Sequence, residues 1–126
     1  MRLDEKAREN LEAVERLLPD DAGRDGLLNA AASRAYYAAY LAVADRALDA
    51  GLTFTDREGT YFRHDDLPDD AGRWGILDDD GRDELSHLYA LRIKADYLED
   101  QIDLEEATQA HTIAHRFVEN LIGEKR

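Results

Sequence analysis

Residues 27–50 contain neither glycine nor proline and are rich in alanine. Alanine has the highest helix propensity, and glycine and proline have the lowest, so a long helix is predicted over residues 26–50. Gly51 follows directly and is a plausible helix C-cap. Because alanines occupy more than one face of this helix, other helices can approach it closely. The stretch therefore predicts a central helix in an all-helical fold.

Apolar residues recur at helical spacing in three further stretches, which predicts helices over residues 2–18, 82–98 and 104–122. Asp103 and Glu106 have the spacing of a capping box at the start of the last helix. The inner face of that helix is expected to carry Leu104, Ala107, His111, Ala114, Val118 and Leu121.

Residues 51–80 lose this periodicity and contain several glycines and an acidic run at 78–80. We expect a long connection there with one short helix near 64–73. The heptapeptide LPDDAGR occurs at both 18–24 and 67–73, which we interpret as reused turn chemistry. No window alternates as a strand would. We predict an all-α, up-and-down antiparallel bundle of four long helices plus a short helix, forming one domain over residues 1–126.

The composition is strongly acidic, with 29 acidic and 16 basic residues and a formal net charge of -13. Affinity for nucleic acid comes largely from neutralising phosphates, so any RNA contact must use a local basic pocket. The chain has no cysteine, which excludes disulfides and cysteine nucleophiles and suits a reducing cytoplasm. No apolar run is long enough to span a membrane, and the charged start is unlike a signal peptide. We therefore expect a cytoplasmic protein with no membrane contact.

Two motifs connect the chain to a known family. Residues 33–40 read SRAYYAAY, and residues 91–97 read LRIKADY. Together they resemble the HEPN family, in particular its small stand-alone prokaryotic branch. The resemblance implies a helical bundle that often forms a homodimer. Some members are ribonuclease toxins, others pair with a nucleotidyltransferase as a toxin–antitoxin module, and many have no demonstrated activity. It therefore implies a second copy, a nucleotidyltransferase, RNA or a nucleotide as partners.

Active members of this family use an arginine followed, after four to six residues, by a histidine, often with a tyrosine two residues further on. The histidine suits proton transfer, and the arginine suits stabilisation of phosphorane charge. Two placements of this motif disagree. Arg82, His87 and Tyr89 match it literally. Arg92 matches its expected place just before the last helix, but Tyr97 stands where the histidine would be.

We favour the placement at Arg92, because there the motif and its context agree. The missing histidine then indicates a non-catalytic or weakly active module that binds RNA, a nucleotide or a partner protein. The predicted ligand-binding residues are Arg34, Tyr37, Arg92, Asp96 and Tyr97. The alternative is a metal-independent endoribonuclease toxin that uses Arg82, His87 and Tyr89 as catalytic residues.

Two purely structural interpretations accompany these assignments. Arg92 and Asp96 are four residues apart, the spacing of an ion pair on one helix. The tyrosines at 36, 37 and 40 could stack on a base, but such clusters more often pack in a core or a dimer interface.

His111 and His115 are four residues apart on one predicted helix, a spacing that suits a pair of metal ligands. No glutamate follows His111, and the sequence offers no evident third ligand. We therefore expect neither a metal nor a cofactor.

Overall fold

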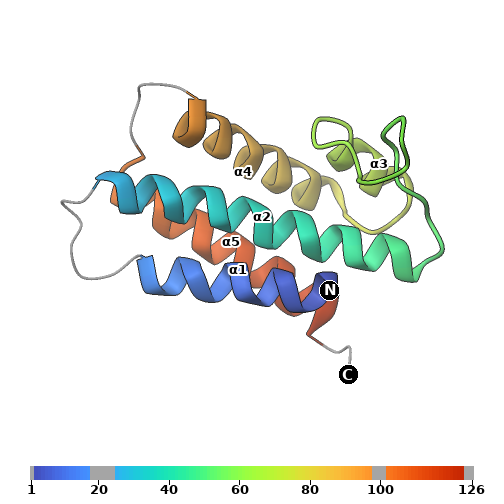
Figure 1. Ribbon diagram of the computed structural model, residues 1–126, viewed down its shortest axis with the longest axis horizontal. Coiled ribbons are helices and arrows are strands. Elements are labelled where there is room, and N and C mark those ends of the chain that lie inside the picture. Colours follow the sequence, from blue (N-terminus) through green and yellow to red (C-terminus); the bar gives the residue numbers. More distant parts are fainter. Residues whose placement is uncertain (1, 18–24, 98–101, 124–126) are drawn as a thin grey trace.

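A computed structural model of the chain describes residues 2–17, 25–97 and 102–123. These residues form five helices and no strand. The helices are α1 (Leu3–Leu17), α2 (Asp25–Asp49), α3 (Leu67–Arg73), α4 (Asp79–Tyr97) and α5 (Leu104–Ile122). Helices α1, α2, α4 and α5 run alternately in opposite directions along the bundle, while α3 lies at one end, near the start of α4 (Figure 1). The predicted all-α antiparallel bundle is confirmed.

Helix α2 is the centre of the bundle, as the alanine pattern predicts. It packs against α1, α4 and α5. Alanines on several of its faces, among them Ala31, Ala32 and Ala47, have no exposed surface. Small side chains let helix axes come close together. Since other helices of the same chain cover these faces, the alanine pattern gives no argument for a homodimer.

The short helix predicted near 64–73 is confirmed as α3, so the heptapeptide at 67–73, which we interpreted as turn chemistry, is helical. The acidic run at 78–80, which we expected in the connection, lies at the start of α4. There the Asp78 side chain accepts a hydrogen bond of 2.7 Å from the Gly81 backbone N–H. The carboxylates of Asp79 and Asp80 lie in the first turn, where the helix dipole favours negative charge. The heptapeptide at 67–73 forms α3, with Pro68 in the first turn, where its missing N–H costs nothing. Its other copy, at 18–24, lies outside the described residues.

The capping box of α5 is confirmed, but the predicted inner face of this helix is partly wrong. The Asp103 side chain accepts from the Glu106 N–H at 2.7 Å, and the Glu106 side chain accepts from the Asp103 N–H at 3.1 Å. Leu104 is 42% exposed, and His111 is only half-buried. Both lie off the buried face because steps of three and four residues allow more than one stripe. The buried face consists of Ala107, Ala110, Ala114, Phe117, Val118 and Ile122.

The connection between α2 and α3 packs a small satellite core at the end of the bundle. Phe62 is fully buried and its ring contacts those of Phe54 and Trp74. The Tyr40 hydroxyl of α2 donates to the Phe62 carbonyl at 2.7 Å. This connection is therefore fixed against α2. None of the described helices combines the length and apolarity required to cross a membrane.

Candidate functional site

The side chain of Arg92, near the end of α4, meets α2 in a polar cluster. Its Nη2 donates to the hydroxyl of Tyr37 at 3.0 Å and to that of Tyr97 at 3.4 Å. Its Nε lies 3.2 Å from Oδ2 of Asp96, and the Ser33 hydroxyl donates to the same oxygen at 3.3 Å. Because Arg92 and Asp96 are one turn apart on α4, and Ser33 and Tyr37 one turn apart on α2, each helix contributes one face. We call these five residues the Arg92 seam.

The residues of the Arg92 seam differ in how far they are exposed, from the mostly buried Arg92 to the mostly exposed Tyr97. The Arg92 guanidinium lies 5.3 Å from the centre of the Tyr37 ring and 5.5 Å from that of Tyr97. The Arg92 side chain is only 15% exposed and Asp96 33% exposed, whereas Tyr97 is 66% exposed. Both tyrosine hydroxyls accept hydrogen bonds from Arg92, and the exposed Tyr97 ring can be reached by a ligand.

The donors of Arg92 are unequally used. Nη2 is shared between the two tyrosine hydroxyls. Nε is buried and close to Asp96, but it lacks the alignment of a hydrogen bond. Nη1 makes no hydrogen bond with any described residue and, unlike Nε, is not a buried unpaired atom. A ligand at the Arg92 seam would therefore find one guanidinium donor that no described residue occupies.

Four of the five predicted ligand-binding residues meet in this seam, and Arg34 does not. Its side chain is exposed on α2 and donates to the Asn10 side chain of α1 at 3.4 Å. Asn29, one turn before Ser33 on α2, connects the Arg92 seam to the backbone of α4 and to the residue two positions before α5. Its side chain accepts from the Ile102 N–H at 3.0 Å and donates to the Ala95 carbonyl at 3.5 Å.

The residues of the literal motif lie in three different surroundings within the chain. Arg82 donates to Asp69 of α3 at 2.8 Å, a hydrogen bond that raises the pKa of Arg82 above its usual value. His87 is exposed and lies beside α5. Tyr89 is half-buried, with its ring 5.3 Å from that of Tyr36. A single chain therefore does not gather Arg82, His87 and Tyr89 around one point.

The structure brings to the tyrosine cluster a histidine that sequence reasoning did not select. Nδ1 of His64 lies 2.5 Å from the hydroxyl of the buried Tyr36. Its ring stacks on Tyr40 at 4.3 Å and, more distantly, on Tyr89 at 6.1 Å. Burial, followed by the nearby charge of Arg92, lowers the pKa of His64. Both effects favour the neutral form of the imidazole. It lines a surface hollow of about 400 Å³ together with Tyr89.

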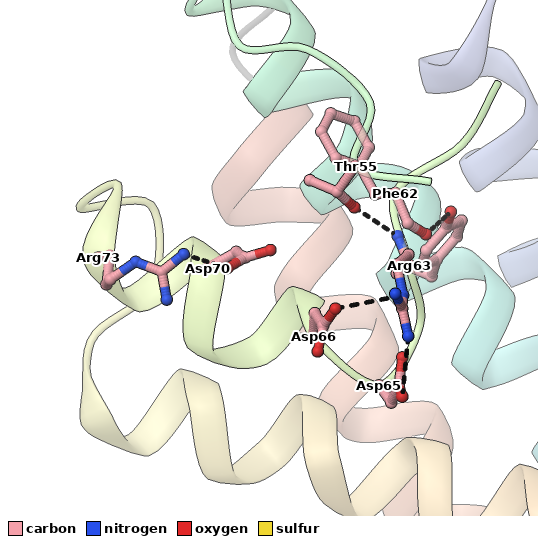
Figure 2. A network of polar contacts seen from close by, with 8 residues as sticks. Thr55, Phe62, Arg63, Asp65, Asp66, Asp70 and Arg73 are labelled. Atoms are coloured by element: carbon pink, nitrogen blue, oxygen red, sulfur yellow. Dashed lines mark hydrogen bonds and ion pairs between the residues drawn. The ribbon is translucent and has the colours of Figure 1, made fainter. Parts of the chain in front are cut away.

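Polar contacts of the preceding residue fix the position of His64. The backbone N–H of Arg63 donates to the Thr55 hydroxyl at 2.8 Å. The Arg63 guanidinium pairs with Asp66 at 3.2 Å and with Asp65 at 3.8 Å (Figure 2). Residues 55–66 have no period that could indicate this arrangement. The contact with Tyr36, 28 positions earlier in the chain, depends on tertiary packing.

A second polar cluster lies where α1 passes α5. The predicted histidine pair, His111 and His115, is joined there by Glu15 of α1. One possible ligand atom from each of the three lies within 4.8 Å of the others. Among the described residues, this is the one group of three side chains with that geometry, and the sequence did not reveal that Glu15 joins the two histidines.

The molecule is thus an antiparallel helical bundle with a polar cluster between α2 and α4 that contains an arginine, an aspartate and two tyrosines. The family model of the HEPN domain matches residues 1–125. The chain therefore belongs to the HEPN family, which confirms the family that its two motifs indicated. Searches of curated proteins and of solved structures gave no match to this chain.

Proposed function

We propose that this HEPN-family chain is a binding module, not an efficient nuclease, and that it takes a nucleotide or the end of a single-stranded RNA at the Arg92 seam. One observation carries the proposal. The Arg92 guanidinium is held between Tyr37 and the exposed Tyr97, with Nη1 free of protein partners among the described residues. A flat ring beside an available guanidinium donor matches a base attached to a phosphate.

The surrounding charge limits how long such a ligand can be. Asp96 offsets much of the Arg92 charge, and the whole chain carries a formal net charge of -13. A long RNA would bring many phosphates against this acidic surface without enough cations to neutralise them. Stacking on an aromatic ring contributes about 1–3 kcal/mol per base and does not depend on that field. A mononucleotide or a strand end therefore fits better than a long strand.

Weak or absent catalysis is supported at both motif placements. Beside Arg92, the position of the family histidine holds Tyr97. Arg82, His87 and Tyr89, the residues of the endoribonuclease alternative, have separate surroundings in one chain. RNA cleavage needs a proton-transfer group and a charge-stabilising group at the same phosphate. At Arg92 the histidine is missing, and at the other placement Arg82 and His87 have separate surroundings.

Family membership is what supports the proposed partners. We propose a homodimer and, within a toxin–antitoxin pair, a nucleotidyltransferase partner. Light scattering tests the first, because a dimer has twice the 14.3 kDa mass of one chain. Co-purification with the product of an adjacent nucleotidyltransferase gene tests the second.

Binding titrations test the ligand site. We expect the chain to bind a short fluorescein-labelled single-stranded RNA at low salt. Changing Tyr97→Ala should weaken binding about tenfold, equivalent to roughly 1.4 kcal/mol of lost stacking. Tyr61→Ala is the matched control, because Tyr61 is also an exposed tyrosine, at 46%, but lies outside the Arg92 seam. Equal affinity of the Tyr97→Ala variant and the unmodified chain would contradict the proposal.

A further inference from the structure

Three metal-binding side chains converge where the last turn of α1 passes α5. His111 and His115 lie one turn apart on α5, and Glu15 reaches them from α1. Nε2 of His111 is 3.2 Å from Oε2 of Glu15. The ligand atoms of all three residues lie within 4.8 Å of one another, and no second group of this kind occurs in the described parts of the chain.

We propose that Glu15, His111 and His115 form a binding site for Zn²⁺ or a similar borderline divalent metal. Zinc binds imidazole nitrogens and carboxylate oxygens at about 2.0–2.1 Å, so tetrahedral ligands lie about 3.3 Å apart. The contact between His111 and Glu15 already has this separation. Glu15 and His115 are exposed, so side-chain rotation can bring the third ligand to the same distance without moving either helix.

The donor set selects the class of metal. Two imidazoles and one carboxylate suit zinc, nickel or copper, whereas calcium and magnesium require oxygen ligands. Three protein ligands leave a fourth position for water or another group, as in open zinc sites. The acidic chain also draws cations to its surface, because its formal net charge is -13.

A bound ion would fasten the first helix of the bundle to the last. It would bind the folded chain, in which α1 and α5 lie side by side, and not the unfolded chain. It would therefore raise the melting temperature by mass action. The site shares no residue with the Arg92 seam, so the two proposals succeed or fail independently.

The test titrates the untagged chain of 126 residues with ZnCl₂ in the presence of a competing chromophoric chelator. We expect one Zn²⁺ per chain and a melting temperature that rises by several degrees in excess zinc. His115→Ala removes one ligand but retains the His111–Glu15 contact. It should lower zinc affinity at least tenfold while leaving the zinc-free melting temperature unchanged. Glu15→Gln should lower the affinity in the same way.

The control is His87→Ala, which removes another exposed histidine and should bind zinc as the unmodified chain does. Equal affinity of His115→Ala and the unmodified chain would overturn the proposal. So would an equal rise in melting temperature with Mg²⁺, which would indicate diffuse attraction to the acidic surface. An effect of His115→Ala without any effect of Glu15→Gln would also overturn it, since α1 would then take no part.

Discussion

Replacing Arg92 by methionine separates the packing of its aliphatic stem from the interactions of its guanidinium. Methionine is unbranched and fills a similar apolar volume, so most of the stem's burial is retained. The bond to Tyr37 at 3.0 Å is the main loss, because a hydrogen bond to a charged group contributes about 1.5–3 kcal/mol. The bond to the exposed Tyr97 is longer, at 3.4 Å, and contributes little.

Two further effects set the size of the change. The ion pair with Asp96, whose side chain is one-third exposed, contributes about 0.3–0.5 kcal/mol at this helical spacing. Against these losses, the variant no longer buries a charged group whose Nε lacks a hydrogen bond. We therefore expect Arg92→Met to lower the free energy of unfolding by about 1–2 kcal/mol.

Urea denaturation of a double-mutant cycle with Asp96→Asn measures this prediction. The coupling between Arg92 and Asp96 should be below about 1 kcal/mol. For a chain of this size, the melting temperature of the Arg92→Met variant should be about 3–10 °C lower than that of the unmodified chain. A decrease in the free energy of unfolding of about 3–5 kcal/mol in Arg92→Met would refute the reasoning if adding Asp96→Asn restored the stability. That result would mark a buried structural ion pair. The seam would then hold the fold together instead of presenting Arg92 to a ligand.

Three further predictions concern stability. Tyr40→Phe should cost about 1–2 kcal/mol in urea denaturation, because the Phe62 carbonyl loses its donor, whereas the same change at the exposed Tyr61 should cost less than about 0.5. Asp103→Ala should cost about 1 kcal/mol by removing the cap of α5, while Asp103→Asn, which can still cap, should cost much less. Because burial and Arg92 lower the pKa of His64, the unfolded chain takes up a proton at higher pH than the folded chain. The contribution of neutral His64 to the free energy of unfolding should therefore be complete above about pH 6.5 and decline as pH falls. His64→Gln should flatten that part of the curve of stability against pH, and an unchanged slope would contradict it.

The helices could be predicted from the sequence because their determinants are local. The long run without glycine or proline, the apolar period and the capping box at Asp103 all act within one element. The start of α4 was predicted too late because the acidic run at 78–80 is typical of a turn and equally of a first helical turn. The heptapeptide at 67–73 forms a helix for a similar reason. Its composition is compatible with a turn and with a helix, so its tertiary surroundings determine which of the two it forms.

The candidate sites show where local reasoning ends. Arg92 and Asp96 could be paired from spacing along one helix, and Tyr37 came from the resemblance. Arg34 is only one residue from Ser33, but one residue is about 100° around a helix, so it contacts α1 instead of α4. Glu15 and His64 reach their partners through tertiary packing over 96 and 28 positions, respectively, and no local pattern marks either residue.

Nuclear magnetic resonance gives the most direct test of the proposed ligand site. The ¹⁵N-labelled chain would be titrated with adenosine monophosphate while its backbone amide resonances are followed. We expect the largest shifts along one turn of α2, from Ser33 to Tyr37, and along the end of α4, from Arg92 to Tyr97. Saturable shifts that appear only elsewhere, or none at all at millimolar nucleotide, would contradict the account.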